Sequence, residues 1–250
     1  MFKALLVDDN LNFRSALHEA LHSRFPFCDL VSADGVQSAL RKVARLRPDL
    51  VITDLMMPDG NGFDLIRRLR AMKVTARIVV LTIHDLPEYR EEAVRSGADE
   101  FFTKLSTSVQ DIFGYIEGLL DQRLRALVVC GEPSLNNVIG ALLAARCADV
   151  VTARTFGLED GVQTGRLLKP HVVLLHAEDD AGRERLYGET LTIGLRGTSM
   201  RLVCVRSRPV ASDTPSGSEF VVSRGVDFED QVVRIVDLVR AEQSPGRAAT

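Results

Sequence analysis

The chain has 250 residues, of which 46% are hydrophobic, and its formal net charge at neutral pH is −3. This length predicts one large domain or two ordinary ones, and the composition is that of a globular protein with a packed core. The charge balance lacks the excess of lysine and arginine that is typical of a nucleic-acid-binding domain. We therefore expect no nucleic-acid partner.

The sequence contains no apolar run of about 18 residues, so we expect no membrane span and no membrane partner. The first residues, MFKALLVDD, lead directly into a strand pattern and lack the layout of a signal peptide. The cysteines form no CxxC pair and have mostly apolar neighbours, which is typical of buried free thiols. They are Cys28, Cys130, Cys147 and Cys204. These features favour a cytoplasmic protein.

Short apolar runs alternate with longer helical patterns through the first half of the chain. The predicted strands are Phe2–Val7, Leu30–Ala33, Leu50–Thr53, Ile78–Leu81 and Glu100–Thr103. The predicted helices are Asn12–His22, Val36–Leu46, Gly62–Met72, Glu88–Ser96 and Ser108–Arg123. Continuous Val, Ile and Leu strands separated by helices indicate a parallel sheet covered on both faces. The first half is therefore predicted to be a doubly wound α/β domain.

The second half repeats the pattern of the first. The stretch KALLVDDNLNFRSALHEAL from Lys3 aligns without gaps on RALVVCGEPSLNNVIGALL from Arg125, 122 residues further on. RPDLVITD from Arg47 aligns on KPHVVLLH from Lys169 at the same offset. The shared order and offset indicate a duplicated fold. After a strand at Leu202–Val205, the second copy has RSRPVASDTPSGSE, which is too rich in Pro, Ser and Gly for a helix, so we expect it to lack the fourth helix.

Polar side chains stand at the ends of the predicted strands in the first half. Asp8 and Asp9 follow the first strand, Asp54 follows the third, Thr82 ends the fourth and Lys104 follows the fifth. Ligands of open parallel sheets bind beyond these carboxyl ends. Converging carboxylates repel one another unless a cation is present, and Mg²⁺ prefers such oxygen ligands. With the lysine and the hydroxyl available for anionic oxygens, the set is suited to accepting a phosphoryl group on the third aspartate.

Any one of these aspartates has a simpler explanation, since aspartates at strand ends often cap the next helix or terminate a turn. The whole set, however, occurs in stretches that have a characteristic order. LLVDDN, VITDLMMPDGNGFDL, VVLTIHD and GADEFFTK together resemble the receiver domain of two-component response regulators. The resemblance covers residues 1–123. It implies a flavodoxin-like sheet with the strand order 2-1-3-4-5.

The resemblance also implies a phosphoacceptor and a metal site. Asp54 would take a phosphoryl group from the phosphohistidine of a sensor histidine kinase or a phosphotransfer protein. Asp9 and Asp54 would bind Mg²⁺ directly together with the backbone carbonyl of Met56, and Asp8 would act through water.

Further roles are implied for residues around this site. Thr82 and Lys104 would hold the phosphoryl oxygens, and Phe101 stands in the place of the switch aromatic that responds together with Thr82. Met56 and His84 stand where receivers tune their rate of dephosphorylation.

One position departs from the family pattern. Receivers usually carry proline after the lysine, often with a cis bond, but here Leu105 follows Lys104. A non-proline cis bond costs about 2.5–4 kcal/mol. We therefore expect either a trans bond with a moved loop or a weaker site.

The second half lacks the chemistry of the first. In the alignment, Asp8, Asp9, Asp54, Thr82 and Lys104 correspond to Cys130, Gly131, His176, Arg206 and, approximately, Arg224. Residues 124–242 are therefore predicted to form a degenerate pseudo-receiver domain, followed by a disordered tail at 243–250. We expect the histidine to be satisfied by a backbone group rather than to accept phosphate. The two arginines are expected at the surface, with a shared anion site as the alternative.

The sequence thus predicts a response regulator with two tandem domains, a phosphoacceptor receiver at 1–123 and a pseudo-receiver at 124–242. The second domain would act as a dimerisation or docking surface for a downstream protein rather than bind DNA. Such a receiver catalyses only its own phosphorylation and dephosphorylation, and is not otherwise an enzyme. The alternatives are a phosphorylation-independent scaffold and a transcription factor with a hidden DNA-binding half. An aspartate-based phosphohydrolase is disfavoured, because VDDNLN does not fit its DxDx[TV] motif.

Overall fold

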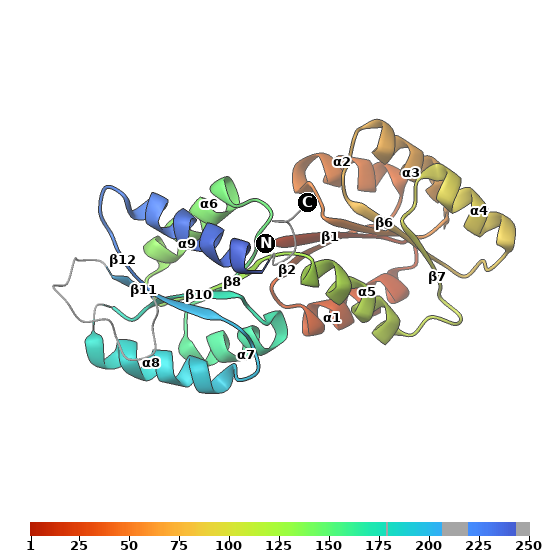
Figure 1. Cartoon of the computed structure of the whole chain (residues 1–250). Coiled ribbons are helices and arrows are strands. Elements are labelled where there is room, and N and C mark those ends of the chain that lie inside the picture. Colours follow the sequence, from red (N-terminus) through yellow and green to blue (C-terminus); the bar gives the residue numbers. More distant parts are fainter. Residues whose placement is uncertain (179, 207–219, 244–250) are drawn as a thin grey trace, which may run out of the picture. The chain divides into compact units, whose positions relative to one another are not determined.

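The computed structural model describes residues 1–178, 180–206 and 220–243 (Figure 1). The chain divides into two compact units, a first unit of Phe2–Gly118 and a second unit of Leu119–Thr250 together with Met1. The predicted loss of the fourth helix concerns residues 207–219, which lie outside the described residues. The predicted disordered tail is 243–250, and of this segment residues 244–250 lie outside the described residues.

The first unit is built around a five-stranded parallel sheet with the order β2-β1-β3-β6-β7. Its strands are β1 (Phe2–Val7), β2 (Cys28–Ala33), β3 (Leu50–Thr53), β6 (Arg77–Thr82) and β7 (Glu100–Thr103). Its helices are α1 (Leu11–Arg24), α2 (Val36–Leu46), α3 (Gly62–Ala71), α4 (Pro87–Ser96) and α5 (Val109–Asp121). Helices α1 and α5 cover one face of the sheet, and α2, α3 and α4 cover the other (Figure 1). This is the predicted doubly wound order.

Local signals explain where the helices begin and end. Asn10 caps α1, since its side-chain oxygen accepts a hydrogen bond from the backbone N–H of Phe13. Helix α4 begins with Pro87 and ends before Gly97, whose φ of 101° is left-handed and suits glycine. One feature was not predicted: β4 (Met56–Met57) and β5 (Gly60–Asn61) form a small antiparallel hairpin between β3 and α3.

The core of the first unit lies between the sheet and its helices. Strand β3 is fully buried along its length, as a central strand covered on both faces must be. The helix facing β3 from one side contributes Leu65, Ile66 and Leu69, none of them exposed. The four cysteines of the chain are buried, as predicted, and none of them forms a disulfide.

The second unit contains a second five-stranded parallel sheet, with the order β12-β11-β10-β8-β9. Its strands are β8 (Arg125–Cys130), β9 (Val151–Thr155), β10 (Val172–His176), β11 (Arg201–Arg206) and β12 (Phe220–Ser223). Its described helices are α6 (Pro133–Arg146), α7 (Leu158–Leu168), α8 (Ala181–Gly194) and α9 (Phe228–Glu242). Helices α6 and α9 cover one face, and α7 and α8 cover the other (Figure 1). Taken in chain order, the strands follow the same path as in the first unit.

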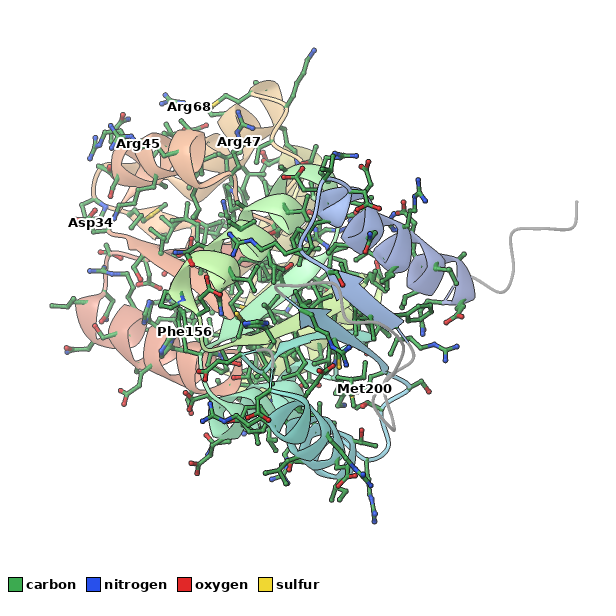
Figure 2. All side chains as sticks on the ribbon, turned by 90° about the vertical axis from the view of Figure 1, so that its left-hand side faces the viewer. Asp34, Arg45, Arg47, Arg68, Phe156 and Met200 are labelled. Carbon is green, nitrogen blue, oxygen red and sulfur yellow. The ribbon has the colours of Figure 1, made fainter. Side chains whose placement is uncertain are left out.

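The repeat of 122 residues is visible in the backbone itself. Arg47, which is labelled in Figure 2, and Lys169 both end a helix in the left-handed conformation with φ of 50°. Phe25 and Cys147 end α1 and α6 with nearly equal dihedrals, φ −128° and ψ 64° against φ −132° and ψ 56°. Left-handed backbone is uncommon for residues other than glycine, so its recurrence at the same offset is specific. The two units therefore share local geometry as well as strand order.

Candidate functional site

The backbone of the first unit places polar residues at the carboxyl ends of neighbouring strands. Asp8 follows β1, and the backbone N–H of Asp54, after β3, donates to the carbonyl of Val7 at 2.9 Å. At the other side of the sheet, the N–H of Lys104 donates to the carbonyl of Thr82 at 2.7 Å. Because each residue directly extends a paired strand, their side chains meet at one edge of the sheet.

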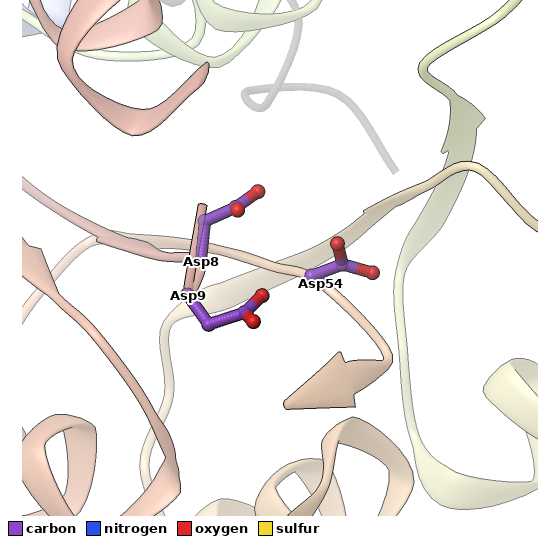
Figure 3. Close-up of side chains that lie close together, drawn as sticks. All are labelled: Asp8, Asp9 and Asp54. Carbon is purple, nitrogen blue, oxygen red and sulfur yellow. The ribbon is translucent and has the colours of Figure 1, made fainter. Parts of the chain in front are cut away.

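Three carboxylates converge at this edge (Figure 3). Asp8, Asp9 and Asp54 each offer one ligand oxygen, and these oxygens all lie within 4.8 Å of one another. Among the described residues, no other group of three acidic, histidine or cysteine side chains converges in this way. Asp8 and Asp54 are buried, whereas Asp9 is exposed. A hard cation with oxygen ligands, such as Mg²⁺, fits this donor set, and the exposed carboxylate leaves the site open to solvent.

Lys104 supplies the positive charge of the site. Its Nζ lies 2.6 Å from Asp8 Oδ2 and 2.5 Å from Asp54 Oδ2. Burial alone would lower the pKa of Lys104, but hydrogen bonds to the two carboxylates outweigh it, and the pKa is raised. The ammonium also lies 4.3 Å from the centre of the Phe13 ring, in a cation–π contact. The lysine is therefore held charged and fixed beside two carboxylates.

Burial dominates the electrostatics of Asp8. Its pKa is raised by burial, which outweighs the hydrogen bond from Lys104. The backbone N–H of Asn10 donates to Asp8 Oδ1 at 2.9 Å, so the loop after β1 also holds this carboxylate in place. Asp54 is oriented in a similar way, because its Oδ1 accepts from the N–H of Leu55 at 2.6 Å. Its Oδ2 faces the lysine.

Thr82 and Phe101, the two residues with an expected switch role, are both buried. Thr82 Oγ1 accepts a long hydrogen bond of 3.4 Å from the backbone N–H of His84. The guanidinium of Arg90, from α4, lies over the Phe101 ring at 4.6 Å from its centre. The same guanidinium pairs with Asp85, with NH2 at 2.5 Å from Oδ1. Through Arg90, helix α4 therefore contacts both Phe101 of β7 and Asp85 in the loop that follows Thr82.

The other expected site residues line the rim. Met56 is 52% exposed, and its N–H points at Asp54 Oδ1 over 3.4 Å. His84 lies beside Tyr89, with ring centres 5.5 Å apart. No described peptide bond is cis, so the bond between Lys104 and Leu105 is trans. The Leu105 side chain is 79% exposed and takes no part in holding the carboxylates.

Some contributors were not found from the sequence. Asn10 is one of them, although an asparagine directly before a helical pattern is a recognisable N-cap signal. Asp59 caps α2 instead of its own helix, with Oδ1 accepting from Val36 N–H at 2.8 Å and Oδ2 from Gln37 N–H at 2.9 Å. The partners of Asp59 lie more than 20 residues earlier in the chain. No local pattern reveals such a pairing.

The corresponding edge of the second unit carries different chemistry. The backbone N–H of Arg224 donates to the carbonyl of Arg206 at 2.7 Å, the same bond that Lys104 makes to Thr82, so Arg224 takes the lysine position. His176 ends β10 and pairs in register with Cys130. His176 is buried, and its Nδ1 lies 2.8 Å from the carbonyl of Val205, as expected for a histidine satisfied by the backbone.

The prediction that Arg206 lies at the surface is wrong. Its side chain is buried, and its Nε lies 2.9 Å from Oε2 of Glu184, which is itself buried in α8. The alignment of the two halves could not show this pair, because Glu184 aligns with no acidic residue of the first half. The Arg206 charge is thus compensated inside the unit, which is the arrangement that a buried charge requires.

The fold of the first unit is the doubly wound sheet that the resemblance to receiver domains implies. Residues 4–116 match the model of the response regulator receiver domain. We conclude that this part of the chain is such a domain, as the sequence predicted.

Several transcriptional regulators are similar to this part of the chain. DNA-binding transcriptional activator DevR/DosR of Mycobacterium tuberculosis is 33% identical over 136 residues, which cover 52% of this chain and 62% of that protein. Virulence transcriptional regulatory protein PhoP of Salmonella typhimurium is 30% identical over 120 residues, covering 48% of this chain and 52% of PhoP. This chain thus spans about half the length of the curated relatives it matches.

Two solved structures are each similar to about half of this chain. Chemotaxis protein CheY4 of Vibrio cholerae is 25% identical, with a TM-score of 0.44, and the match covers 47% of this chain and 98% of CheY4. A two-component response regulator from Clostridium difficile is 21% identical, with a TM-score of 0.45, over 48% of this chain and 96% of that one.

These comparisons bear on two further expectations. The expectation of no nucleic-acid partner is not supported, because the similar proteins are named as transcriptional regulators and one of them as DNA-binding. The prediction of no membrane span concerns the helices. None of the helices in the described ranges is both long enough and apolar enough to cross a bilayer.

Proposed function

We propose that Asp54 accepts a phosphoryl group from a histidine kinase or phosphotransfer protein, with Mg²⁺ bound by the carboxylates around it. The observation that supports this best is the convergence of Asp8, Asp9 and Asp54 within 4.8 Å, with Lys104 in contact with two of them. A capping or turn role for each aspartate alone gives no reason for this meeting of three acids and a lysine.

The proposed chemistry is transfer to a carboxylate. An oxygen of Asp54 attacks phosphorus, the bond from phosphorus to the donor imidazole nitrogen breaks, and an acyl phosphate forms while the donor ring takes up a proton. When bound, Mg²⁺ supplies positive charge against the transferred oxygens. Lys104 gives up its contact with Asp54 Oδ2 and holds a phosphoryl oxygen instead. Asp9, Asp54 and the backbone carbonyl of Met56 would hold the metal directly, and Asp8 would hold it through water.

We further propose that Thr82 and Phe101 bring about the conformational change that follows phosphorylation of Asp54. Among the described residues, the hydrogen bond of the Thr82 hydroxyl is a long one of 3.4 Å from His84 N–H, so turning the hydroxyl toward a phosphoryl oxygen costs little. A shift of the loop after Thr82 moves Asp85, which pairs with the Arg90 guanidinium lying over Phe101. Met56 and His84, on the rim of the site, are proposed to tune how fast water removes the phosphoryl group.

We propose that residues 124–242, which lie within the second unit, form a pseudo-receiver that contacts a downstream protein or a second copy of the chain. The support is its parallel sheet of the same order and the replacement of the acceptor position by His176. A gel shift at low and high salt with mixed-sequence DNA separates this output from a DNA-binding one. Salt-sensitive binding by the isolated full chain would refute a purely protein-directed output.

Phosphorylation is tested by intact mass spectrometry after incubation with Mg²⁺ and acetyl phosphate. We expect one phosphoryl adduct in the wild type and none in Asp54→Ala. Asp34→Ala is the matched control, because Asp34 also follows a strand of the same sheet but lies outside the carboxylate trio, and this variant should still be labelled. The absence of any adduct in the wild type would favour the alternative, a scaffold that works without phosphorylation. An adduct that survives in Asp54→Ala would also contradict the proposal.

A further inference from the structure

A groove lies between strand β2 and helix α2 in the first unit. It is a cavity of about 590 Å³ lined by Val31, Arg41, Lys42, Arg45 and Leu46. All of these residues belong to the first unit, so this unit forms the groove by itself. Helix α2 starts near the carboxyl ends of the strands and runs back along the sheet, which places its last turn away from Asp54. The groove is therefore separate from the phosphoacceptor edge.

The charge beside this groove is positive and uncompensated. Among the five helices of the first unit, all of which lie in the described residues, α2 is the one without an acidic residue. Arg41 and Arg45 are exposed (Arg45 is labelled in Figure 2), and neither pairs with a carboxylate in the described part of the chain. Because they are separated by about one helical turn, their guanidinium groups lie on the same face of α2. They form a row of positive charge along the groove.

The floor of the groove is apolar. Val31 and Leu46 are partly buried, pack against the core of the first unit and also line the cavity. The phosphate backbone of a nucleic acid is polar and has no apolar group to cover such a floor. An amphipathic protein segment, in contrast, presents acidic and apolar side chains side by side. The groove therefore fits a protein segment better than a nucleic acid.

The outer edge of β2 is closed to an added strand. The carbonyl of Ala33 points toward the β1 side, where it accepts a backbone hydrogen bond at 3.1 Å. Successive carbonyls of a strand point to opposite sides, so those of Leu30 and Ser32 point outward. The Ser32 carbonyl accepts from Lys42 Nζ, and the Leu30 carbonyl lies 3.3 Å from His18 Nε2. Side chains thus occupy the outward carbonyls that an added strand would use, which favours a helix that binds through its side chains.

We propose that this groove binds an acidic amphipathic helix of a partner protein. Two carboxylates of that helix, one turn apart, pair with Arg41 and Arg45, since a guanidinium group matches a carboxylate in shape and charge. An apolar side chain of the helix covers Val31 and Leu46, as in other complexes that place a helix in a groove. The first unit thereby has a protein-binding surface that does not involve the acceptor aspartate.

The test measures the fluorescence anisotropy of a labelled, designed peptide to which the full chain is added without Mg²⁺ or a phosphoryl donor. The peptide has about 18 residues, long enough to be partly helical in water, with glutamates one turn apart beside a stripe of leucines. A peptide of the same composition in scrambled order controls for charge alone. We expect saturable binding of the helical peptide, weaker binding of the scrambled one, and loss of affinity at high salt.

Variants of the groove identify the contacts. Arg41→Gln combined with Arg45→Gln should weaken binding about tenfold, because two exposed ion pairs are lost. Both side chains are exposed, so this double variant leaves the core intact. Arg41→Glu combined with Arg45→Glu should instead bind the peptide in which lysines replace the glutamates. Val31→Thr, which replaces a methyl group of the floor by a hydroxyl, should weaken binding of the original peptide by a smaller factor.

Arg95→Gln is the matched control, since it removes an exposed positive charge of α4 that does not line the groove. This variant should bind the helical peptide like the wild type. The proposal is overturned if the wild type does not distinguish the helical from the scrambled peptide, or if the double glutamine variant binds as tightly as Arg95→Gln. It is also overturned if the wild type prefers mixed-sequence DNA to the peptide and the double glutamine variant loses that DNA binding, which would indicate a phosphate-backbone site.

Discussion

Lys104 Nζ lies 2.5 Å from Asp54 Oδ2, so the cation and the proposed acceptor of the first unit are in direct contact before any phosphoryl group arrives. In the second unit, the corresponding residues Arg224 and His176 do not pair with each other, and Glu132 stands between them. The same positions of the fold therefore hold a directly paired ammonium and carboxylate in the first unit and two nitrogen bases in the second. In the proposed reaction, the phosphoryl group would separate Lys104 from the Asp54 oxygen that it contacts.

Replacing this lysine should impair phosphoryl transfer more than folding. In Lys104→Met, the phosphoryl oxygens lose a fixed positive charge, and labelling of Asp54 by acetyl phosphate should slow by about 10²-fold. The rate is measured by intact mass spectrometry over time at saturating Mg²⁺. Lys73→Met, on the surface after α3, is the control and should label at the wild-type rate. An unchanged rate in Lys104→Met would contradict the assigned role.

Binding of Mg²⁺ should weaken in mildly acidic solution. Burial raises the pKa of Asp8, so this carboxyl takes up a proton at a higher pH than an ordinary aspartate does. A proton on Asp8 removes the negative charge with which this residue would hold the metal through water, so Mg²⁺ affinity falls as the pH is lowered through that raised pKa. The dependence is measured by titration calorimetry between neutral pH and the onset of acid unfolding. Asp8→Asn should bind Mg²⁺ more weakly, with a shallower pH dependence.

The glycine that begins α3 should tolerate no side chain. A Cβ on Gly62 would lie 2.3 Å from the backbone oxygen of Asp54, so Gly62→Ala forces α3 and the acceptor loop apart. We expect a loss of about 1–3 kcal/mol in unfolding free energy, as for overpacked sites, together with slower labelling of Asp54. Gly114→Ala is the control, because a Cβ at that exposed position of α5 meets nothing within 4 Å. That change should stabilise the protein by about 0.5–1 kcal/mol. Urea unfolding measures both.

The buried ion pair of the second unit should behave as a coupled pair. Arg206→Met leaves the buried Glu184 carboxylate without its main partner, and we expect a loss of about 3–5 kcal/mol. The double variant Arg206→Met with Glu184→Leu should recover most of this loss, since no buried charge remains. Hydrogen-exchange mass spectrometry on peptides of α8 and β11 reports the stability of this unit separately. Additive losses in the double variant would show that the two side chains act independently.

Much of the first unit could be predicted from particular residues. The apolar run of β3 with Asp54 after it, the helical pattern of α2 and the left-handed end of α4 at Gly97 are each specified within a few residues. The meeting of Asp8, Asp9 and Asp54 could be predicted because strand ends are recognisable and parallel strands end on the same side. The offset of 122 residues likewise revealed the second sheet before any coordinates, because burial on both faces imposes the same apolar runs in both copies.

The tertiary structure alone decided which charges meet. Glu184 faces Arg206 from a helix, Asp59 caps a helix that precedes it by more than 20 residues, and Glu132 reaches both His176 and Arg224. Periodicity and propensity act over one or two turns of chain, so they place strands and helices and the residues at their ends. Pairings between side chains depend on the distances and directions created when the helices pack on the sheet. Local sequence therefore determined the positions of the charged residues in both units, and packing determined their partners.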